Sequence, residues 1–317
     1  MKIAYVFPGQ GSQSVGMLRE LAQQHAEVRA TFDIASTALG FDLWELASQG
    51  PEERLNQTQN TQPAMLTAGI AVWRAWRVQN GPDCAYVAGH SLGEYTALVC
   101  AGALEFADAV KLVAERSRFM QEAVPVGEGA MAAILGLDDA AVRALCAQAA
   151  EGDVLDAVNY NAPSQVVIAG TARAVARAVA QAKDAGAKRA LPLPVSVPAH
   201  SRLMQPAATR LAERLQTAAW RAPRVPVLHN VHACPEPDVK ALPALLARQV
   251  ASPVRWVDTI TAMAQAGVTH VIELGPGKVL TGLNKRIAPQ IECLAVNDPA
   301  SLAAALAAIR IKEGMEA

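Results

Sequence analysis

The chain has 317 residues, of which 52% are hydrophobic and 18% are charged, and its formal net charge is -1 at pH 7. A chain of this length and hydrophobic content can bury a large core. A net charge so close to zero provides no overall electrostatic attraction to nucleic acid or to an anionic membrane. We therefore expect neither as a partner, and any charged partner would need a local patch.

The cysteines and the first residues indicate a reducing compartment. The five cysteines are scattered and include no C-x-x-C pair. Such a set argues against a disulfide framework and against a thiolate zinc site. The first residues carry one lysine and a short apolar run that ends at Pro8, too short for a signal peptide or a membrane span. We expect a cytoplasmic protein.

Short apolar runs alternate with amphipathic segments along most of the chain. In order, the patterns predict a strand at 3–7, helices at 15–39 and 64–79, a strand at 84–89 and a helix at 106–124. After residue 194 they predict a strand at 225–231, a helix at 241–250, and strands at 269–275 and 292–297. Apolar strands alternating with helices predict a parallel sheet in a layered α/β fold.

The segment 127–194 departs from this alternation. It reads as a strand at 129–137, a helix at 138–150, a hairpin at 154–170, a helix at 172–186 and a strand at 187–193. This β-α-β-β-α-β order is that of a ferredoxin-like unit. We therefore expect a small ferredoxin-like subdomain at 127–194, inserted into a large α/β subdomain formed by 1–126 and 195–317.

The sequence "GHSLGE" allows two interpretations of Ser91. Gly89, Ser91 and Gly93 form a G-x-S-x-G pattern between a predicted strand and a predicted helix, which is the pattern of a nucleophile elbow. Ser91 and Glu94 also match the S-x-x-E capping box of a helix start. A cap alone does not explain both glycines, so the nucleophile is favoured, although one serine can fulfil both roles.

A nucleophilic serine needs a base, and the chain has six histidines. His200 is the best candidate because it follows the proline-rich stretch "LPLPVSVP" and precedes a predicted helix, and catalytic residues often lie on such loops. His90 directly precedes Ser91, so its side chain should point away from the hydroxyl. The ordinary expectation for His25 and His270 is a structural role.

Three further motifs bear on the chemistry. "HNVHAC" at 229–234 has an unusual spacing for zinc and no evident fourth ligand, so we expect no metal there. "FPGQGSQSVG" at 7–16 has Ser14 where the dinucleotide fingerprint requires its third glycine, but this turn can present a main-chain N–H to an oxyanion. Arg116 and Arg118 lie late in a predicted helix, where an arginine is ordinarily exposed, so chemistry would require one to turn inward.

Seven blocks of sequence together resemble one enzyme family. They are "FPGQGSQSVGM", "TQPAMLT", "GHSLGEYTALVCAGAL", "RSRFMQEAVPVGEGAMAAILGL", "NYNAPSQVVIAG", "AKRALPLPVSVPAHSRLMQPAA" and "ELGPGKVLTGLNKRI". Their colinear order resembles the bacterial malonyl-CoA:acyl carrier protein transacylases of fatty acid biosynthesis. The resemblance implies an α/β-hydrolase-like large subdomain that carries a ferredoxin-like small one.

The resemblance also implies roles for particular residues. Ser91 is the nucleophile and His200 its base, and a glutamine carbonyl that falls on Gln249 orients the histidine. A neutral acceptor of this kind fixes the imidazole tautomer, as the carboxylate of a serine protease does. The main-chain N–H groups of Gln10 and Leu92 form the oxyanion hole.

Two residues are implied to bind the acyl group. Arg116 matches the arginine that pairs with the free malonyl carboxylate, which a planar guanidinium can bind through two parallel hydrogen bonds. Gln62 matches a further residue of the acyl pocket. The sequence departs from the commonest family pattern at Ser117, Ser201 and Ser252, and none of these changes removes a catalytic group.

The implied reaction is ping-pong transfer of malonyl from malonyl-CoA to the phosphopantetheine thiol of acyl carrier protein, without metal or other cofactor. Arg202, Lys285 and Arg286 are candidates for a basic patch that meets the acidic carrier. We expect a monomer. The alternatives are a malonyltransferase for another carrier, such as a malonate decarboxylase subunit or a polyketide pathway, a serine hydrolase or thioesterase, and an acyl-CoA binding module in which Ser91 is only a cap.

Overall fold

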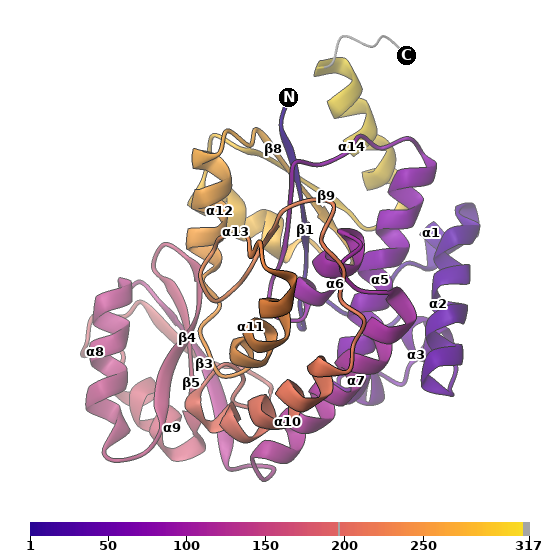
Figure 1. The fold of residues 1–317 in the computed structure, drawn as a ribbon. Coiled ribbons are helices and arrows are strands. Elements are labelled where there is room, and N and C mark those ends of the chain that lie inside the picture. The colour runs from indigo at the N-terminus through magenta and orange to yellow at the C-terminus, as the bar shows by residue number, and fades with distance from the viewer. Residues whose placement is uncertain (196, 313–317) are drawn as a thin grey trace.

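The computed structural model describes residues 1–195 and 197–312 and contains two sheets (Figure 1). A five-stranded sheet has the order β7-β2-β1-β8-β9, and a four-stranded sheet has the order β4-β5-β3-β6. The strands of the first sheet are β1 (Ile3–Phe7), β2 (Tyr86–Gly89), β7 (Val227–Leu228), β8 (His270–Leu274) and β9 (Glu292–Val296). Those of the second are β3 (Gly129–Leu135), β4 (Leu155–Ala162), β5 (Gln165–Thr171) and β6 (Arg189–Pro192).

Every pair of neighbours in the larger sheet is parallel, and helices cover both of its faces. All five residues of β1 are buried, and they alternate between two apolar clusters. Ile3, Tyr5 and Phe7 belong to one cluster, and Ala4 and Val6 belong to the other. A strand buried on both faces needs a nearly continuous hydrophobic sequence, which is why the run at 3–7 has no charged or amide side chain.

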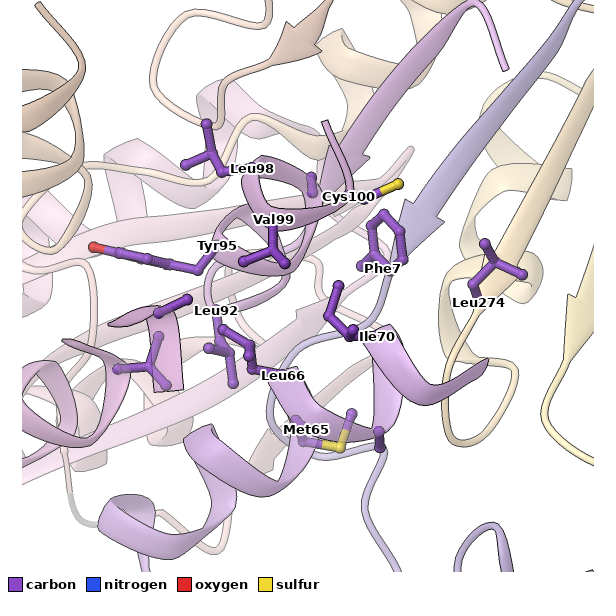
Figure 2. Close-up of a cluster of buried hydrophobic side chains, with 14 of the residues drawn as sticks. Phe7, Met65, Leu66, Ile70, Leu92, Tyr95, Leu98, Val99, Cys100 and Leu274 are labelled. Atoms are coloured by element: carbon purple, nitrogen blue, oxygen red, sulfur yellow. The ribbon is translucent and has the colours of Figure 1, made fainter. Parts of the chain in front are cut away.

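The two apolar clusters are completed by different helices. One face of β1 packs with residues of α2, α5, α6 and α7, and the other packs with residues of α12 and α13. Figure 2 shows the first cluster where Phe7, Leu66, Ile70 and Tyr95 meet. The helices of this part of the chain are α1 (Arg19–Gln24), α2 (Ala26–Leu39), α3 (Leu43–Gln49), α4 (Glu52–Leu55), α5 (Thr58–Val78), α6 (Gly93–Cys100), α7 (Phe106–Ala123), α10 (Gln205–Gln216), α11 (Leu242–Gln249), α12 (Trp256–Gln265), α13 (Val279–Ile287) and α14 (Pro299–Lys312).

The smaller sheet is antiparallel and has the strand order of a ferredoxin-like unit. Two helices, α8 (Asp139–Ala150) and α9 (Ala172–Gln181), supply apolar residues that pack on one face of it. Asp138 and Thr171 begin these helices, since their side chains accept hydrogen bonds from main-chain N–H groups of the first turn. Met131 and Val158 belong to a separate apolar cluster.

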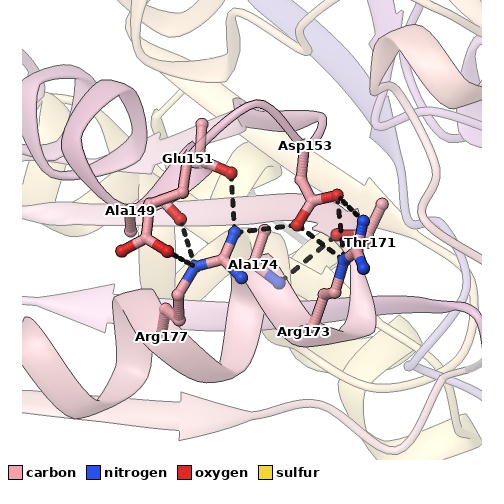
Figure 3. Close-up of polar contacts among 8 residues, drawn as sticks. Ala149, Glu151, Asp153, Thr171, Arg173, Ala174 and Arg177 are labelled. Carbon is pink, nitrogen blue, oxygen red and sulfur yellow. Dashed lines mark hydrogen bonds and ion pairs between the residues drawn. The ribbon is translucent and has the colours of Figure 1, made fainter.

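A polar cluster joins the end of α8 to α9, as Figure 3 shows. Arg177 donates to the main-chain carbonyls of Ala149 at 2.8 Å and Ala150 at 2.6 Å, which are the last residues of α8. Asp153 accepts from both Arg173 and Arg177, and these two guanidinium groups lower the pKa of its carboxyl. The cluster satisfies carbonyls that have no partner within α8.

The two sheets are connected through β4 and the segment after α11. Tyr160 N–H donates to the carbonyl of Val254 at 3.0 Å, and Val254 N–H donates to the carbonyl of Val158 at 2.8 Å. Arg286 of α13 donates to the carbonyl of Pro163 at 2.7 Å, in the turn of the β4–β5 hairpin. These bonds hold the smaller sheet against the larger one.

The predicted parallel sheet and ferredoxin-like unit are confirmed, but several elements differ in extent; the helix expected at 64–79, for example, is α5 and begins at Thr58. The helix expected at 15–39 is interrupted at His25, whose extended backbone separates α1 from α2. The strand expected at 225–231 pairs only over Val227 and Leu228, because the chain then turns and uses Asn230 for side-chain contacts. The subdomain boundaries at 126/127 and 194/195 stay a prediction. No helix among the described residues is both long and apolar enough to cross a membrane.

We predict that Leu66→Ala strongly destabilises the protein, because Leu66 is fully buried in the cluster of Figure 2. A buried Leu→Ala change usually costs about 2–5 kcal/mol, through lost transfer free energy and a residual cavity. Urea unfolding would measure the change in the free energy of unfolding. Val126→Ala is the control, since Val126 is 82% exposed and should change it by about 0.5 kcal/mol or less. A similar cost for both variants would contradict the packing described.

Candidate active site

Ser91 lies on a sharp turn between β2 and α6. Its backbone has a φ of 52°, in the left-handed region that a serine rarely adopts. A Cβ on Gly89 would lie 1.9 Å from the main chain of Gly93, and a Cβ on Gly93 would lie 2.1 Å from the carbonyl oxygen of Phe7. Both positions therefore require glycine. This geometry is that of the predicted elbow.

The turn brings Ser91 to His200. The distance from Ser91 Oγ to His200 Nε2 is 2.7 Å, and that from His200 Nδ1 to the main-chain carbonyl oxygen of Gln249 is 2.9 Å. A carbonyl only accepts, so Nδ1 carries the proton and Nε2 is the acceptor. The Ser91 hydroxyl can therefore donate to Nε2, which is the arrangement needed for proton removal.

His200 is neutral in this environment. Burial, and after it the positive charge of Arg116, lower the pKa of His200 to about 3. A buried imidazole beside a cation resists protonation because its charged form loses hydration and is repelled. A neutral imidazole keeps its lone pair free to accept a proton at neutral pH.

Arg116 turns inward from α7 and is almost fully buried, whereas Arg118 is exposed. Arg116 Nη1 donates to Gln62 Oε1 at 2.6 Å, and Nη2 donates to Ser91 Oγ at 3.2 Å and to Gln249 Oε1 at 3.0 Å. Its guanidinium also lies 5.4 Å from the centre of the Tyr95 ring. A full positive charge is thus held directly beside the serine hydroxyl.

Gln249 contributes two different groups. Its main-chain carbonyl contacts His200, as given above, while its side-chain oxygen accepts from Arg116. The side-chain Nε2 donates to the carbonyl of Ser91 at 2.9 Å and to Glu94 Oε2 at 3.0 Å. The residue therefore links the histidine, the arginine and the elbow.

The capping box predicted for Ser91 and Glu94 is wrong. The Ser91 side chain contacts His200 and Arg116, and the buried Glu94 carboxylate accepts from His229, Asn230 and Gln249. Both side chains are drawn into tertiary contacts, and α6 begins at Gly93 without a side-chain cap.

Asn230 is a site residue that the sequence analysis missed. Its Oδ1 accepts from Ser91 N–H and its Nδ2 donates to the carbonyl of Gly89, both at 2.7 Å. It therefore holds the main chain on both sides of His90. The motif "HNVHAC" drew attention only as a possible metal site. The described residues contain no group of three or more histidine, cysteine and acidic side chains placed to hold a metal ion.

His90 points away from the hydroxyl, as predicted. Its Nε2 lies 2.8 Å from Oδ1 of Asn161 on β4, and its ring lies 5.6 Å from that of Trp256. Burial lowers the pKa of His90, so the ring is a neutral wall of the site. The contact with Asn161 joins the elbow to the smaller sheet.

A cavity of about 140 Å³ lies in front of Ser91. Ser91, Arg116, Gln62 and His200 line it from the larger part of the molecule, and Met131 lines it from β3 of the smaller sheet. Gln10 and Leu92 complete the wall near the hydroxyl, and no described residue accepts a hydrogen bond from either main-chain N–H. The structure thus brings together all seven residues predicted for the site.

Comparison with known proteins identifies the class of enzyme to which this fold and this serine elbow belong. Residues 4–302 match the acyl transferase domain, so the chain belongs to that family. The malonyl CoA-acyl carrier protein transacylase of Salmonella typhimurium is 57% identical over 305 residues, which are 96% of this chain and 99% of the relative. The transacylase of the same name from Bacillus subtilis is 46% identical over 98% of both chains. Within the acyl transferases, the chain belongs with the malonyl CoA-acyl carrier protein transacylases.

Solved structures agree with this placement. An acyl carrier protein S-malonyltransferase from Vibrio cholerae superposes with a TM-score of 0.94 at 55% identity, over 96% of this chain and 100% of the other. A malonyl-transacylase solved in complex with a type II polyketide acyl carrier protein superposes with a TM-score of 0.96 at 50% identity, over 97% and 100%. Identities of this size extend the likeness beyond the fold alone.

We predict that Gly93→Ala disrupts the elbow, because the added Cβ would meet the main chain of β1. Overpacking against a rigid backbone costs about 1–3 kcal/mol or more. Thermal unfolding would report the loss of stability, and a serine-directed fluorophosphonate probe would report the loss of Ser91 reactivity. Gly282→Ala on α13 is the matched control, since nothing lies within 4 Å of its added Cβ. Normal labelling and stability of Gly93→Ala would be incompatible with the close approach.

Proposed function

We propose that this protein transfers the malonyl group of malonyl-CoA to the phosphopantetheine thiol of acyl carrier protein, through a malonyl ester on Ser91. The observation that carries the proposal is the buried guanidinium of Arg116, with Nη2 3.2 Å from Ser91 Oγ. A hydrolase of simple acyl esters has no use for a cation there, whereas a malonyl group has a free carboxylate to pair with it. The names of the relatives support the same substrates.

In the first half-reaction, His200 Nε2 takes the Ser91 proton and Oγ attacks the thioester carbonyl of malonyl-CoA. The 2.7 Å contact suits this transfer, and the carbonyl of Gln249 holds the imidazole in the required tautomer. The N–H groups of Gln10 and Leu92 stabilise the tetrahedral oxyanion. Collapse of this intermediate expels the CoA thiolate, which receives the proton from His200.

In the second half-reaction, the pantetheine thiol of the carrier replaces CoA. His200 removes the thiol proton, the thiolate attacks the malonyl ester, and Ser91 Oγ recovers the proton as it leaves. The first half-reaction converts a thioester into an ester, and the second converts that ester back into a thioester. The chemistry therefore requires no metal, nucleotide or other cofactor.

Arg116 selects the acyl group. Its donors now contact Ser91, Gln62 and Gln249, and a bound malonyl carboxylate takes the place of the Ser91 contact. Two parallel N–H donors match two carboxylate oxygens, and burial strengthens the pairing. The acyl-enzyme is thereby held in one orientation until the carrier thiol arrives.

A groove of about 450 Å³ shares Gln10, Thr58 and Val195 with the cavity and suits the pantetheine arm. Among the basic residues considered for carrier docking, Arg202 is paired with Asp156, and Arg286 contacts the β4–β5 turn. Lys285, which directly precedes Arg286, is exposed and is the better candidate to meet an acidic carrier. We place the enzyme in the cytoplasm and expect it to act as a monomer.

Intact mass spectrometry tests the acyl-enzyme directly. Incubation with malonyl-CoA should add one malonyl group to the wild-type protein and none to Ser91→Ala, because the ester forms on Oγ. Addition of acyl carrier protein should then discharge the adduct to the carrier thiol. Discharge to water at the same rate without carrier would instead identify a hydrolase, and the absence of any adduct would identify a binding module.

We predict that Arg116→Ala lowers malonyl transfer far more than acetyl transfer. Loss of a charge-assisted hydrogen-bonded pair costs about 1.5–3 kcal/mol, which is roughly ten- to a hundredfold in kcat/KM for malonyl-CoA. The acetyl group has no free carboxylate for Arg116 to bind, so acetyl transfer should change much less. Arg118→Ala, on the same helix and exposed, is the matched control. Equal losses for both acyl groups would refute the proposed role of Arg116.

A further inference from the structure

Two carboxylates are fully buried among the described residues, those of Glu94 and Glu273. Glu273 accepts from the N–H groups of Leu280 and Thr281 and so begins α13. The Glu94 carboxylate does not cap a helix in this way, and Glu94 does not line the cavity in front of Ser91. The reaction described above gives Glu94 no role, although a buried charge is costly to retain without a partner.

The Glu94 carboxylate is fully engaged by donors behind the elbow. Oε1 lies 2.7 Å from His229 Nδ1, and Oε2 accepts from Asn230 N–H and from Gln249 Nε2, each at 3.0 Å. None of these donors carries a permanent charge. The nearest permanent cation in this network is Arg116, whose Nη2 donates to the oxygen of the same Gln249 amide.

The Gln249 amide has only one favourable orientation between these two charges. Its NH₂ group faces two acceptors, Glu94 Oε2 and the carbonyl of Ser91, and its oxygen faces the guanidinium. The reversed amide would put oxygen against two oxygens and NH₂ against a group that only donates. The amide dipole is thus aligned between the carboxylate and the guanidinium, with its positive end toward Glu94 and its negative end toward Arg116.

We propose that Glu94 is the counter-anion of Arg116, acting through the Gln249 amide, and that it limits how tightly the pocket binds an acyl group with a free carboxylate. The proposal rests on the malonyl-binding role of Arg116. In the empty pocket, Glu94 compensates a guanidinium that has no direct carboxylate partner. In the loaded pocket, the negative charge of Glu94 polarises the Gln249 amide, whose oxygen competes with the malonyl carboxylate for Arg116 and offsets part of their attraction. Glu94 is a positioning residue, since it touches no reacting atom.

Glu94→Gln removes this charge with almost no change of shape. The new amide oxygen can accept from Asn230 and Gln249, and its NH₂ can donate to His229 Nδ1 once that ring takes its other neutral tautomer. The test uses the Ser91→Ala background, which forms no acyl ester, so that calorimetry measures binding of malonyl-CoA and acetyl-CoA alone. We expect Glu94→Gln to lower the Kd of malonyl-CoA by about tenfold and to leave that of acetyl-CoA unchanged.

Two further variants separate this effect from a structural one. In an Arg116→Ala background, Glu94→Gln should no longer change the ratio of the two Kd values, because the cation through which it acts is gone. Glu273→Gln removes the other buried carboxylate and should leave the ratio unchanged. An unchanged or weaker affinity of Glu94→Gln for malonyl-CoA, equal changes for both ligands, or persistence of the effect without Arg116 would each overturn the proposal.

The experiment also distinguishes failure of this inference from failure of the proposed function. If Arg116→Ala alone weakens malonyl-CoA and acetyl-CoA equally, the carboxylate-binding role of Arg116 is refuted. If Arg116→Ala weakens malonyl-CoA selectively while Glu94→Gln changes neither ligand, Arg116 keeps its role and the counter-anion is refuted.

Discussion

The burial of one positive charge beside a serine hydroxyl is the constraint on which the rest of the site depends. Arg116 cannot shed its charge, so its surroundings must compensate for the lost hydration. Two glutamine oxygens, a serine oxygen and an aromatic ring do so, from α5, α6, α11 and the elbow. Burial, together with this charge, keeps His200 neutral, and the carbonyl of Gln249 sets the tautomer in which the Ser91 hydroxyl is the donor.

The elbow shows how a strained conformation is maintained. A serine with positive φ persists only where its surroundings leave no alternative. Here the main chain of β1 and α6 packs against two glycines, and Asn230 binds both Gly89 and Ser91. Glu94 and Gln249 then hold the turn from behind. The conformation of Ser91 is therefore maintained both by packing and by buried hydrogen bonds.

The position of the cavity explains why the smaller sheet matters to the chemistry. Its strands contribute Met131 to the wall of the cavity and Asn161 to the support of His90. Main-chain bonds between β4 and Val254 fix this wall relative to the segment that follows Gln249. The pocket is thus formed by two sheets, and its small volume suits a short acyl group more than a long one.

The sequence by itself determined the alternation of buried strands and helices, the inserted ferredoxin-like unit and the elbow, because each depends on local periodicity and on glycine spacing. Together with the family resemblance, it also predicted seven site residues, which the structure places together around Ser91. Only the tertiary structure decided that Arg116 turns inward, that Gln249 uses its main chain for His200, and that Glu94 is no cap. Those outcomes depend on partners far apart in the sequence, which are 133 residues away for Arg116 and Gln249, 136 for Glu94 and Asn230, and 49 for His200 and Gln249. No local pattern records such contacts, since a buried polar group takes whichever partner the fold brings within reach.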